Sequence, residues 1–163
     1  MAADIYCIDA SSLIDLKHFY RREVFSALWE KVEELVSAGR LTAPDEVFQE
    51  IKDDDILGPW AKTHKKMFRK LDQEQMDAAK EVASRFPRLA KPGRFGPAAD
   101  PFVVALAQLE NRRLSGSLLA FGSICVVVTN ERRDPGKIPA ACAHYKLTCM
   151  ALVDLFQREG WKF

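Results

Sequence analysis

The chain lacks the long apolar runs and the excess charge of one sign that mark several common classes of protein. No apolar stretch approaches the roughly 20 residues that a membrane-spanning helix needs. The N-terminus has no basic segment followed by a long apolar run, so no signal peptide is expected. We therefore expect a soluble, cytoplasmic protein. The net charge is only +1, so a polyanionic partner would have to meet a local patch of cations or bound metal ions.

Cysteine and histidine are also scarce. The chain has three histidines and four cysteines, and no Cys-x-x-Cys pair occurs. A zinc site is therefore not expected, because the ligand spacings are wrong. The cysteines lie in apolar surroundings and are predicted to be small core residues of a protein from a reducing compartment. They are Cys7, Cys125, Cys142 and Cys149.

What the chain does have is enough apolar residues for one domain over residues 1–163. Hydrophobic residues make up 48% of the 163 residues, so a core can form without disulfides or structural metal. Short apolar runs alternate with helical patterns, which predicts an α/β fold with a parallel sheet. Strands are predicted over residues 4–9, 40–43, 124–129 and 147–152. Helices are predicted over residues 23–38, from Pro44, over 62–71 and 72–86, from Asp100, and over 139–145 and 153–159.

Two segments lack the clear pattern of a helix or a strand. Residues 87–97 contain three prolines and two glycines, which excludes regular structure there. Residues 115–123 fit either a loop or a short apolar helix.

Four acidic residues occupy positions where a parallel α/β sheet gathers functional groups. Asp9 follows the first strand, Glu50 lies on the helix after the second, Asp100 begins a helix, and Glu131 follows the central strand. The carboxyl ends of parallel strands meet at one edge. Clustered carboxylates raise one another's pKa, and a Mg²⁺ or Mn²⁺ ion offsets that cost. Such a set is typical of metal-assisted phosphodiester hydrolysis.

Each of these acids also has an ordinary structural interpretation. Asp9 or Ser11 could simply cap the next helix, and Asp100 before Pro101 fits an N-cap. Glu50 could be a solvated helix residue, and Glu131 could belong to a turn. The functional interpretation depends on the four acids converging.

The motifs around these acids resemble those of the PIN-domain ribonucleases, the family of the VapC toxins. The chain is more closely similar to an uncharacterised prokaryotic PIN-like branch. Four motifs occur in the family's order, and each contains one of the acids. A segment similar to the family's ending follows them. They are Tyr6–Ile14, Pro44–Ile51, Ala99–Ala107, Val127–Glu131 and 137–155.

The resemblance implies a three-layer α/β/α sandwich with a central, mostly parallel sheet of about four or five strands. It implies Mg²⁺ or Mn²⁺ ions held by Asp9, Glu50, Asp100 and Glu131, and attack of an activated water that leaves a 5′-phosphate on the cut RNA. Supporting hydroxyls come from Ser11 and Thr129, which resemble groups that orient carboxylates or water. The expected function is a metal-dependent endoribonuclease, the toxin of a toxin–antitoxin pair.

Partners follow from the same resemblance. The RNA substrate is expected to meet a basic face with Trp60 as a stacking platform, Arg94, and Asn130 at the scissile phosphate. A solvated surface is the alternative for the basic face. A cognate antitoxin and a homodimer are expected, and residues 114–121 are either their contact surface or core. The basic face comprises Lys62, Lys65, Lys66, Arg69 and Lys70.

Three departures from the PIN pattern leave alternatives open. Glu131 stands where most PIN domains have Asp, residues 111–123 form a longer link than usual, and Glu46 could replace Glu50 as the second acid. The main alternative function is a catalytically inactive PIN-fold module that binds RNA or protein. A receiver-type domain with Asp9 as phosphoryl acceptor is least favoured, because its acceptor would come too early.

Overall fold

The computed structural model describes residues 3–91 and 98–163. In this part of the chain, five strands form one sheet in the order β3-β2-β1-β4-β5, and all neighbouring strands are parallel. The strands are β1 Ile5–Ile8, β2 Leu41–Pro44, β3 Phe68–Arg69, β4 Cys125–Val128 and β5 Cys149–Met150.

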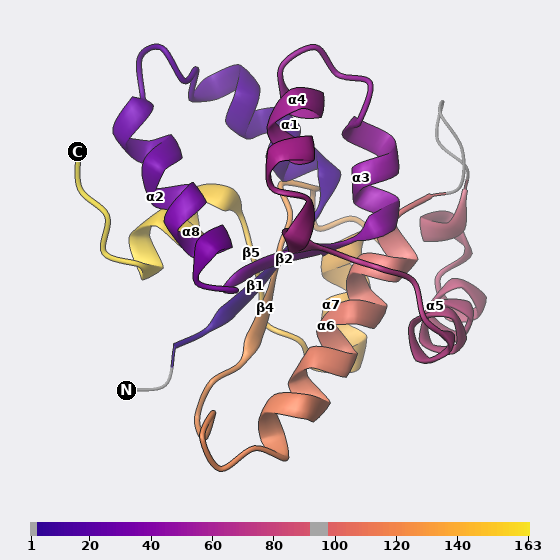
Figure 1. Cartoon of the computed structure of the whole chain (residues 1–163). Helices are drawn as coiled ribbons and strands as arrows, with labels where there is room; N and C mark the ends of the chain where they lie inside the picture. Colours follow the sequence, from indigo (N-terminus) through magenta and orange to yellow (C-terminus); the bar gives the residue numbers. More distant parts are fainter. Residues whose placement is uncertain (1–2, 92–97) are drawn as a thin grey trace.

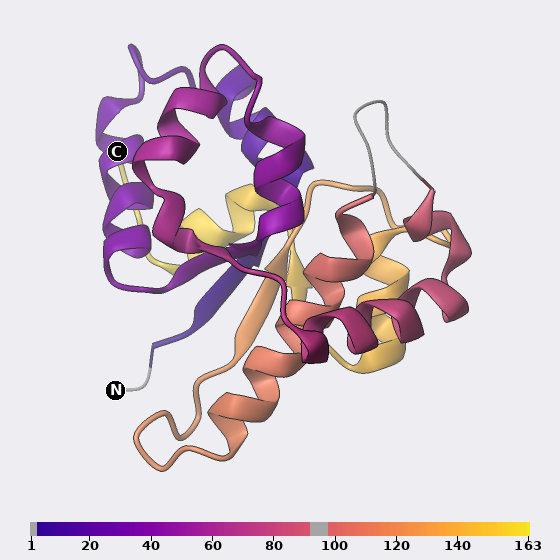
Figure 2. The ribbon, with the colours of Figure 1, turned by 45° about the vertical axis from the view of Figure 1, so that its right-hand side comes forward.

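Helices cover both faces of the sheet. Helices α5, α6 and α7 lie on one side, and α1 to α4 with α8 lie on the other (Figures 1 and 2). The predicted three-layer α/β/α architecture is therefore confirmed, with five strands that are all parallel. The helices are α1 Ala10–Phe19, α2 Ser26–Ser37, α3 Asp45–Ile51, α4 Leu57–Thr63, α5 Gln73–Arg85, α6 Asp100–Ser115, α7 Ile138–Tyr145 and α8 Leu152–Arg158, with short 3₁₀ turns η1 Lys65–Met67 and η2 Pro87–Ala90.

The two central strands are apolar throughout because they are covered on both faces. Cys7 pairs with Val127 and Ile8 pairs with Val128, and all four side chains are buried. This register places the residues that follow β1 next to those that follow β4. It decides which loops meet at the carboxyl edge of the sheet.

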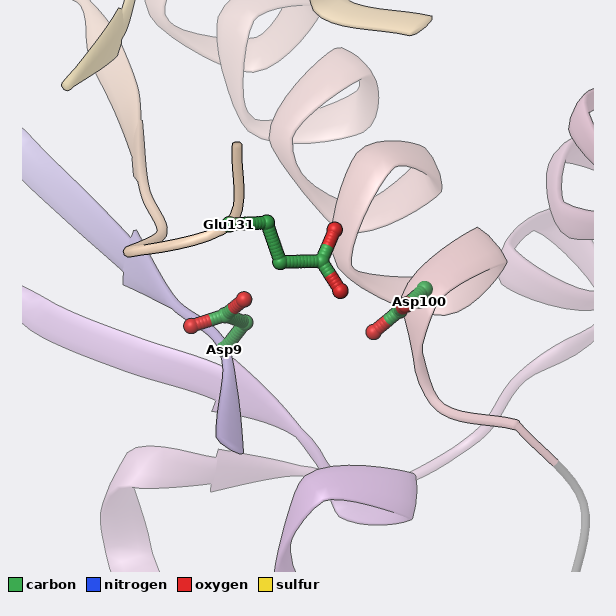
Figure 3. A group of neighbouring side chains, drawn as sticks. All are labelled: Asp9, Asp100 and Glu131. Carbon is green, nitrogen blue, oxygen red and sulfur yellow. The ribbon is translucent and has the colours of Figure 1, made fainter. Parts of the chain in front are cut away.

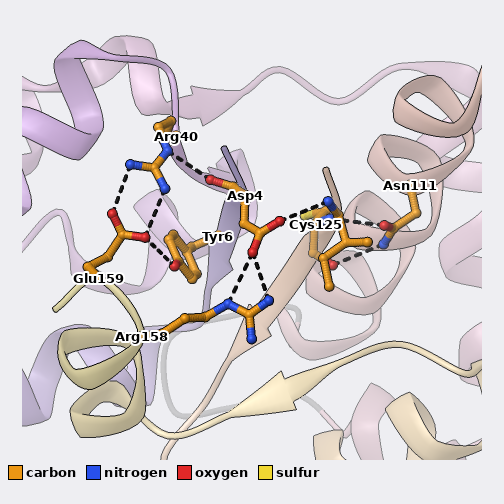
Figure 4. Close-up of polar contacts among 8 residues, drawn as sticks. Asp4, Tyr6, Arg40, Asn111, Cys125, Arg158 and Glu159 are labelled. Atoms are coloured by element: carbon orange, nitrogen blue, oxygen red, sulfur yellow. Dashed lines mark hydrogen bonds and ion pairs between the residues drawn. The ribbon is translucent and has the colours of Figure 1, made fainter. Parts of the chain in front are cut away.

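The opposite, amino edge of the sheet is held by a polar network (Figure 4). Arg40 makes a two-pronged ion pair with Glu159 at 2.8 Å and donates to the carbonyl of Asp4. Tyr6 donates to the same carboxylate at 2.6 Å. Arg158 binds the side chain of Asp4. The network joins β1, the start of β2 and the end of α8.

The N-terminal helices differ from the predicted ones. Helix α1, of ten residues, begins directly after the first strand, in a segment without a predicted element. Helix α2 begins at Ser26 rather than residue 23, so Val24 and Phe25 lie outside it and are 73% and 39% exposed. The predicted helix starts three residues too early, because apolar spacing alone does not show where a helix begins.

Three further predictions about local structure were wrong. Residues 62–71 are not one amphipathic helix but the end of α4, the turn η1 and the edge strand β3. Residues 87–90 form the turn η2 inside the predicted irregular loop, since proline is well tolerated in the first turn of a helix. Asp100 is the first residue of α6 and not its N-cap, which is Ala99.

Residues 116–124 form the loop between α6 and β4. Leu114 is buried, whereas Leu118, Leu119 and Phe121 are 94%, 99% and 84% exposed. Leu114 therefore belongs to the core and Ala120 is partly buried against it, whereas the other three apolar side chains of residues 114–121 are exposed. Among the described residues, no helix combines the length and apolar character needed to cross a membrane.

Candidate metal centre

Three carboxylates meet at the carboxyl edge of the sheet (Figure 3). Asp9 follows β1, Glu131 follows β4, and Asp100 begins α6. Each offers one oxygen, and these three oxygens lie within 4.8 Å of one another. Asp9 and Glu131 approach because β1 and β4 are neighbours in register, whereas Asp100 arrives on a helix that crosses the same strands. The predicted convergence therefore holds for three of the four acids.

Asp9 is both a helix cap and a member of the centre. Its side chain is 1% exposed and accepts a 2.9 Å hydrogen bond from the backbone N–H of Ser12, which caps α1. The hydroxyl of Ser11 lies 2.8 Å from its Oδ2. Burial raises the pKa of Asp9 to about 6, although the hydrogen bonds from Thr129, Ser12 and Ser11 act to lower it. Asp9 thus caps α1 and also belongs to the group of three carboxylates.

Thr129 links two of the acids. Its hydroxyl donates to Oδ2 of Asp9 at 2.5 Å and accepts the backbone N–H of Glu131 at 3.1 Å. Ser11 and Thr129, the two predicted supporting hydroxyls, therefore both contact Asp9. A carboxylate held by several donors keeps one orientation, which suits a metal ligand.

Glu131 is fixed from its other side by α7. Its Oε2 accepts the backbone N–H of Ile138, the first residue of that helix, at 3.1 Å. The N–H groups of a helix start otherwise lack partners. The side chain of Glu131 is longer than that of an Asp, so one of its oxygens reaches the start of α7. Its second oxygen remains available to the centre.

Asp100 carries the largest electrostatic cost of the set. Burial raises the pKa of Asp100 to about 8, and the negative charges of Glu131, Asp9 and Glu50 add to the increase. A carboxyl group with this pKa is largely protonated at neutral pH. The carboxylates of this group repel one another, and a bound cation would reduce that repulsion.

Glu50 lies near the centre but outside the group of three. Its Oε1 accepts the backbone N–H of Ala99 at 3.0 Å, so it holds the residue directly before Asp100. Burial raises the pKa of Glu50, and the charge of Glu131 adds to this. Burial also raises the pKa of Glu46, but the charge acting on it is that of its neighbour Asp45. Of the two alternatives, Glu50 is the acid beside the centre.

The donor set suits a hard divalent cation. All three groups are carboxylates, the ligands that Mg²⁺ and Mn²⁺ prefer. Two oxygens that share a Mg²⁺ ion at about 2.1 Å lie at most about 4.2 Å apart. Oxygens already within 4.8 Å therefore need only a small inward movement to bind one ion. Asp9, Asp100 and Glu131 would be its direct ligands.

RNA binding by the predicted basic face stays a prediction, and the structure shows where its side chains lie. Its five cations are exposed, but Arg69 is paired with Glu110 at 3.0 Å. Glu110 lies ten positions after Asp100 on α6, about 15 Å along the helix. Arg69 therefore lies away from the three carboxylates.

Two other predicted contacts are not supported, and a third is not described. Trp60 is only 6% exposed and packs edge-on against Trp29, so the prediction of a stacking platform was wrong. The side chain of Asn130 already donates to Asp15 and accepts the N–H of Leu152, which leaves it poorly placed for a phosphate. Arg94 lies outside the described residues.

Two hollows that the sequence does not predict share residues with the centre. A cavity of about 820 Å³ shares Thr129 and Glu131 with the site and lies between α1, α7, β5 and α8. A cleft of about 490 Å³ shares Asp100 and is lined by Arg88, Lys91 and Lys137 among others. These cations are scattered between a proline-rich turn and a loop, so no run of basic residues signalled them.

The comparison with known proteins matches nearly the whole chain to one family. No curated protein matches the chain. A family model described as "Domain of unknown function (DUF4411)" matches residues 6–163, and the chain belongs to this family.

Proposed function

We propose that the protein is a PIN-like, metal-dependent endoribonuclease. The observation that supports this most strongly is that carboxylate oxygens of Asp9, Asp100 and Glu131 lie within 4.8 Å of one another. They meet at the edge of the sheet where the motif resemblance places the metal ligands. A carboxyl pKa raised by burial and by neighbouring carboxylates, as that of Asp100 is, is common at functional sites.

The residues of the chain have separate tasks in this proposal. Asp9 is locked by Ser11, Ser12 and Thr129, and Glu131 is anchored on the start of α7. Asp100 is the carboxyl group that holds a proton most strongly and exchanges it for metal. A bound cation would activate water and offset the charge that develops on the phosphate.

The surroundings favour a nucleotide polymer as substrate. The cavity of about 820 Å³ beside Glu131 is within the range of small-ligand sites and can accept one nucleotide. The cationic cleft beside Asp100 suits a neighbouring phosphate. An RNA strand that occupied both hollows would cross the centre, because each hollow shares a residue with the group of three carboxylates.

We further propose a VapC-like role, in which a cognate antitoxin holds the enzyme inactive. An antitoxin or a second copy of the chain would cover the exposed apolar side chains of Leu118, Leu119 and Phe121. Exposed apolar groups of this size are typical of contact surfaces.

The first test is cleavage of a mixed RNA pool with Mg²⁺ or Mn²⁺, with EDTA as the blank. We expect Asp100→Asn to reduce cleavage by at least a hundredfold while the protein remains folded by circular dichroism. Asp53→Asn is the matched control, since Asp53 is an exposed acid on a turn and does not belong to the group of three carboxylates. It should cleave like wild type.

A calorimetric titration with Mn²⁺ completes the test. We expect wild type and Asp53→Asn to bind Mn²⁺, and Asp100→Asn to bind it at least tenfold more weakly. A wild-type protein that neither binds Mn²⁺ nor cuts RNA would refute the nuclease proposal. The catalytically inactive RNA- or protein-binding module would then take its place.

A further inference from the structure

The cleft on the Asp100 side of the centre holds one arginine in a defined position. Cations outnumber acids in its lining. It is lined by η2, the loop before α7 and the start of α6. We propose that Arg88 binds a backbone phosphate of the RNA next to the one that is cut, assisted by Lys91 and Lys137. This inference rests on the proposed function, because it assumes that the scissile phosphate lies at the three carboxylates.

The position of Arg88 depends on a neighbouring glycine, which leaves room for its side chain. Gly136 has a φ of +85°, and a Cβ atom added there would lie 2.5 Å from Cδ of Arg88. Real Cβ atoms do not approach a neighbour this closely, so any other residue at position 136 would push the arginine away. The side chain of Arg88 thus lies across Gly136.

The backbone beside this glycine completes the position. Nη1 of Arg88 donates to the carbonyl oxygen of Pro135 at 3.2 Å. A guanidinium has five N–H donors in a planar fork, so four are left after this bond. An arginine fixed by one donor can present the others to a phosphate in the two-pronged geometry that this group favours.

The charges around the cleft favour an anion. Lys91 and Lys137 line it with Arg88, and all three side chains are exposed. Within residues 3–91 and 98–163, none of the three forms an ion pair with a carboxylate. The acids of the lining are Asp134, which is exposed, and Asp100, which belongs to the metal centre.

The position of the cleft identifies which phosphate it would hold. Asp100 lines the cleft and also contributes to the group of three carboxylates. A phosphate in the cleft is therefore next to the cutting site and not remote from it. The predicted basic face at residues 62–70 lacks this link, since its Arg69 pairs with Glu110 at the far part of α6.

The test is binding of a short, labelled single-stranded RNA in EDTA, where no metal-dependent cleavage occurs. We expect Arg88→Ala to weaken binding about tenfold and to reduce the slope of log affinity against log salt by about one. Arg85→Ala is the matched control: Arg85 lies three positions earlier, is exposed, and is paired with Glu81. It should bind within about twofold of wild type.

Gly136→Ala separates the position of the arginine from its charge. We expect this variant to lose affinity without losing a cation, and the double variant with Arg88→Ala to be no weaker than Arg88→Ala alone. Thermal unfolding of each variant checks the fold. Inorganic phosphate at equal ionic strength should compete no better than chloride, and strong competition would indicate a site for free phosphate and overturn the assignment to RNA.

The outcomes distinguish this inference from the proposed function. If Arg88→Ala and Arg85→Ala bind RNA equally, the inference is wrong even where Asp100-dependent cleavage is found. If binding depends on Arg88 but no RNA is cut with metal, the phosphate cleft stands and the nuclease activity fails. Wild-type protein that binds no RNA at all overturns the inference.

Discussion

The hydroxyl of Thr129 donates a 2.5 Å hydrogen bond to Oδ2 of Asp9, although the two residues are 120 positions apart in the chain. The contact exists because Ile8 and Val128 are partners in the central strand pair. Thr129 thereby joins the ends of β1 and β4, and its oxygen also accepts the N–H of Glu131. One side chain thus orients two acids of the proposed centre.

We predict that Thr129→Val lowers the free energy of unfolding by about 1–3 kcal/mol, because Asp9 and the Glu131 N–H each lose a buried partner. Mn²⁺ affinity should fall as well, since the orientation of Asp9 is no longer enforced. Urea denaturation and calorimetric titration measure the two effects. Thr148→Val, at an exposed threonine, is the control and should change neither quantity; equal losses in both variants would contradict the role given to Thr129.

The stability of the metal-free protein is predicted to fall as pH rises. The folded-state pKa values of Asp9 and Asp100 are raised to about 6 and about 8, above the unfolded value of about 3.9. The folded state therefore binds more protons than the unfolded state between about pH 4 and pH 8, and each deprotonation in that range destabilises the fold.

Thermal unfolding in EDTA from pH 5 to pH 9 tests this prediction. We expect the midpoint of wild type to decrease across the range and that of Asp100→Asn to decrease less, since Asn does not ionise. Excess Mn²⁺ should stabilise wild type more at pH 8 than at pH 6, because protons compete with the metal for the carboxylates. A midpoint in EDTA that rises with pH in wild type would be inconsistent with the buried acids described above.

The ion pair of Arg40 and Glu159 is predicted to support the fold without influencing the centre. Burial acts to raise the pKa of Glu159, but hydrogen bonds from Arg40 and Tyr6 and the charge of Arg40 together hold it below its usual range. Arg40→Ala should lower the free energy of unfolding by about 2–4 kcal/mol, because the half-buried carboxylate loses its partner. Mn²⁺ affinity of the folded protein should not change.

Lys31→Ala provides the comparison for this prediction. Lys31 forms an exposed pair with Glu34, which is expected to contribute at most about 0.5 kcal/mol. Urea denaturation of both variants gives the two values. An Arg40→Ala protein as stable as Lys31→Ala would show that the network at the amino edge of the sheet contributes little.

The sequence by itself determined the layered α/β architecture and three members of the acidic group. The continuous apolar runs before Asp9 and Glu131 are recognisable because a strand buried on both faces needs apolar residues at every position. Asp100 was found because proline directly after it favours the start of a helix. These are local signals, which depend on neighbours in the chain.

Other features depended on contacts between segments distant in sequence, and only the tertiary structure decided them. Trp60 is buried because Trp29 from another helix packs against it. Glu50, rather than Glu46, lies by the centre because it bonds to Ala99. Arg88 reaches the cleft only because Gly136, 48 positions later, leaves room for it. The physical reason is common to all three: packing and hydrogen bonding across the fold select among side chains that local sequence patterns treat alike.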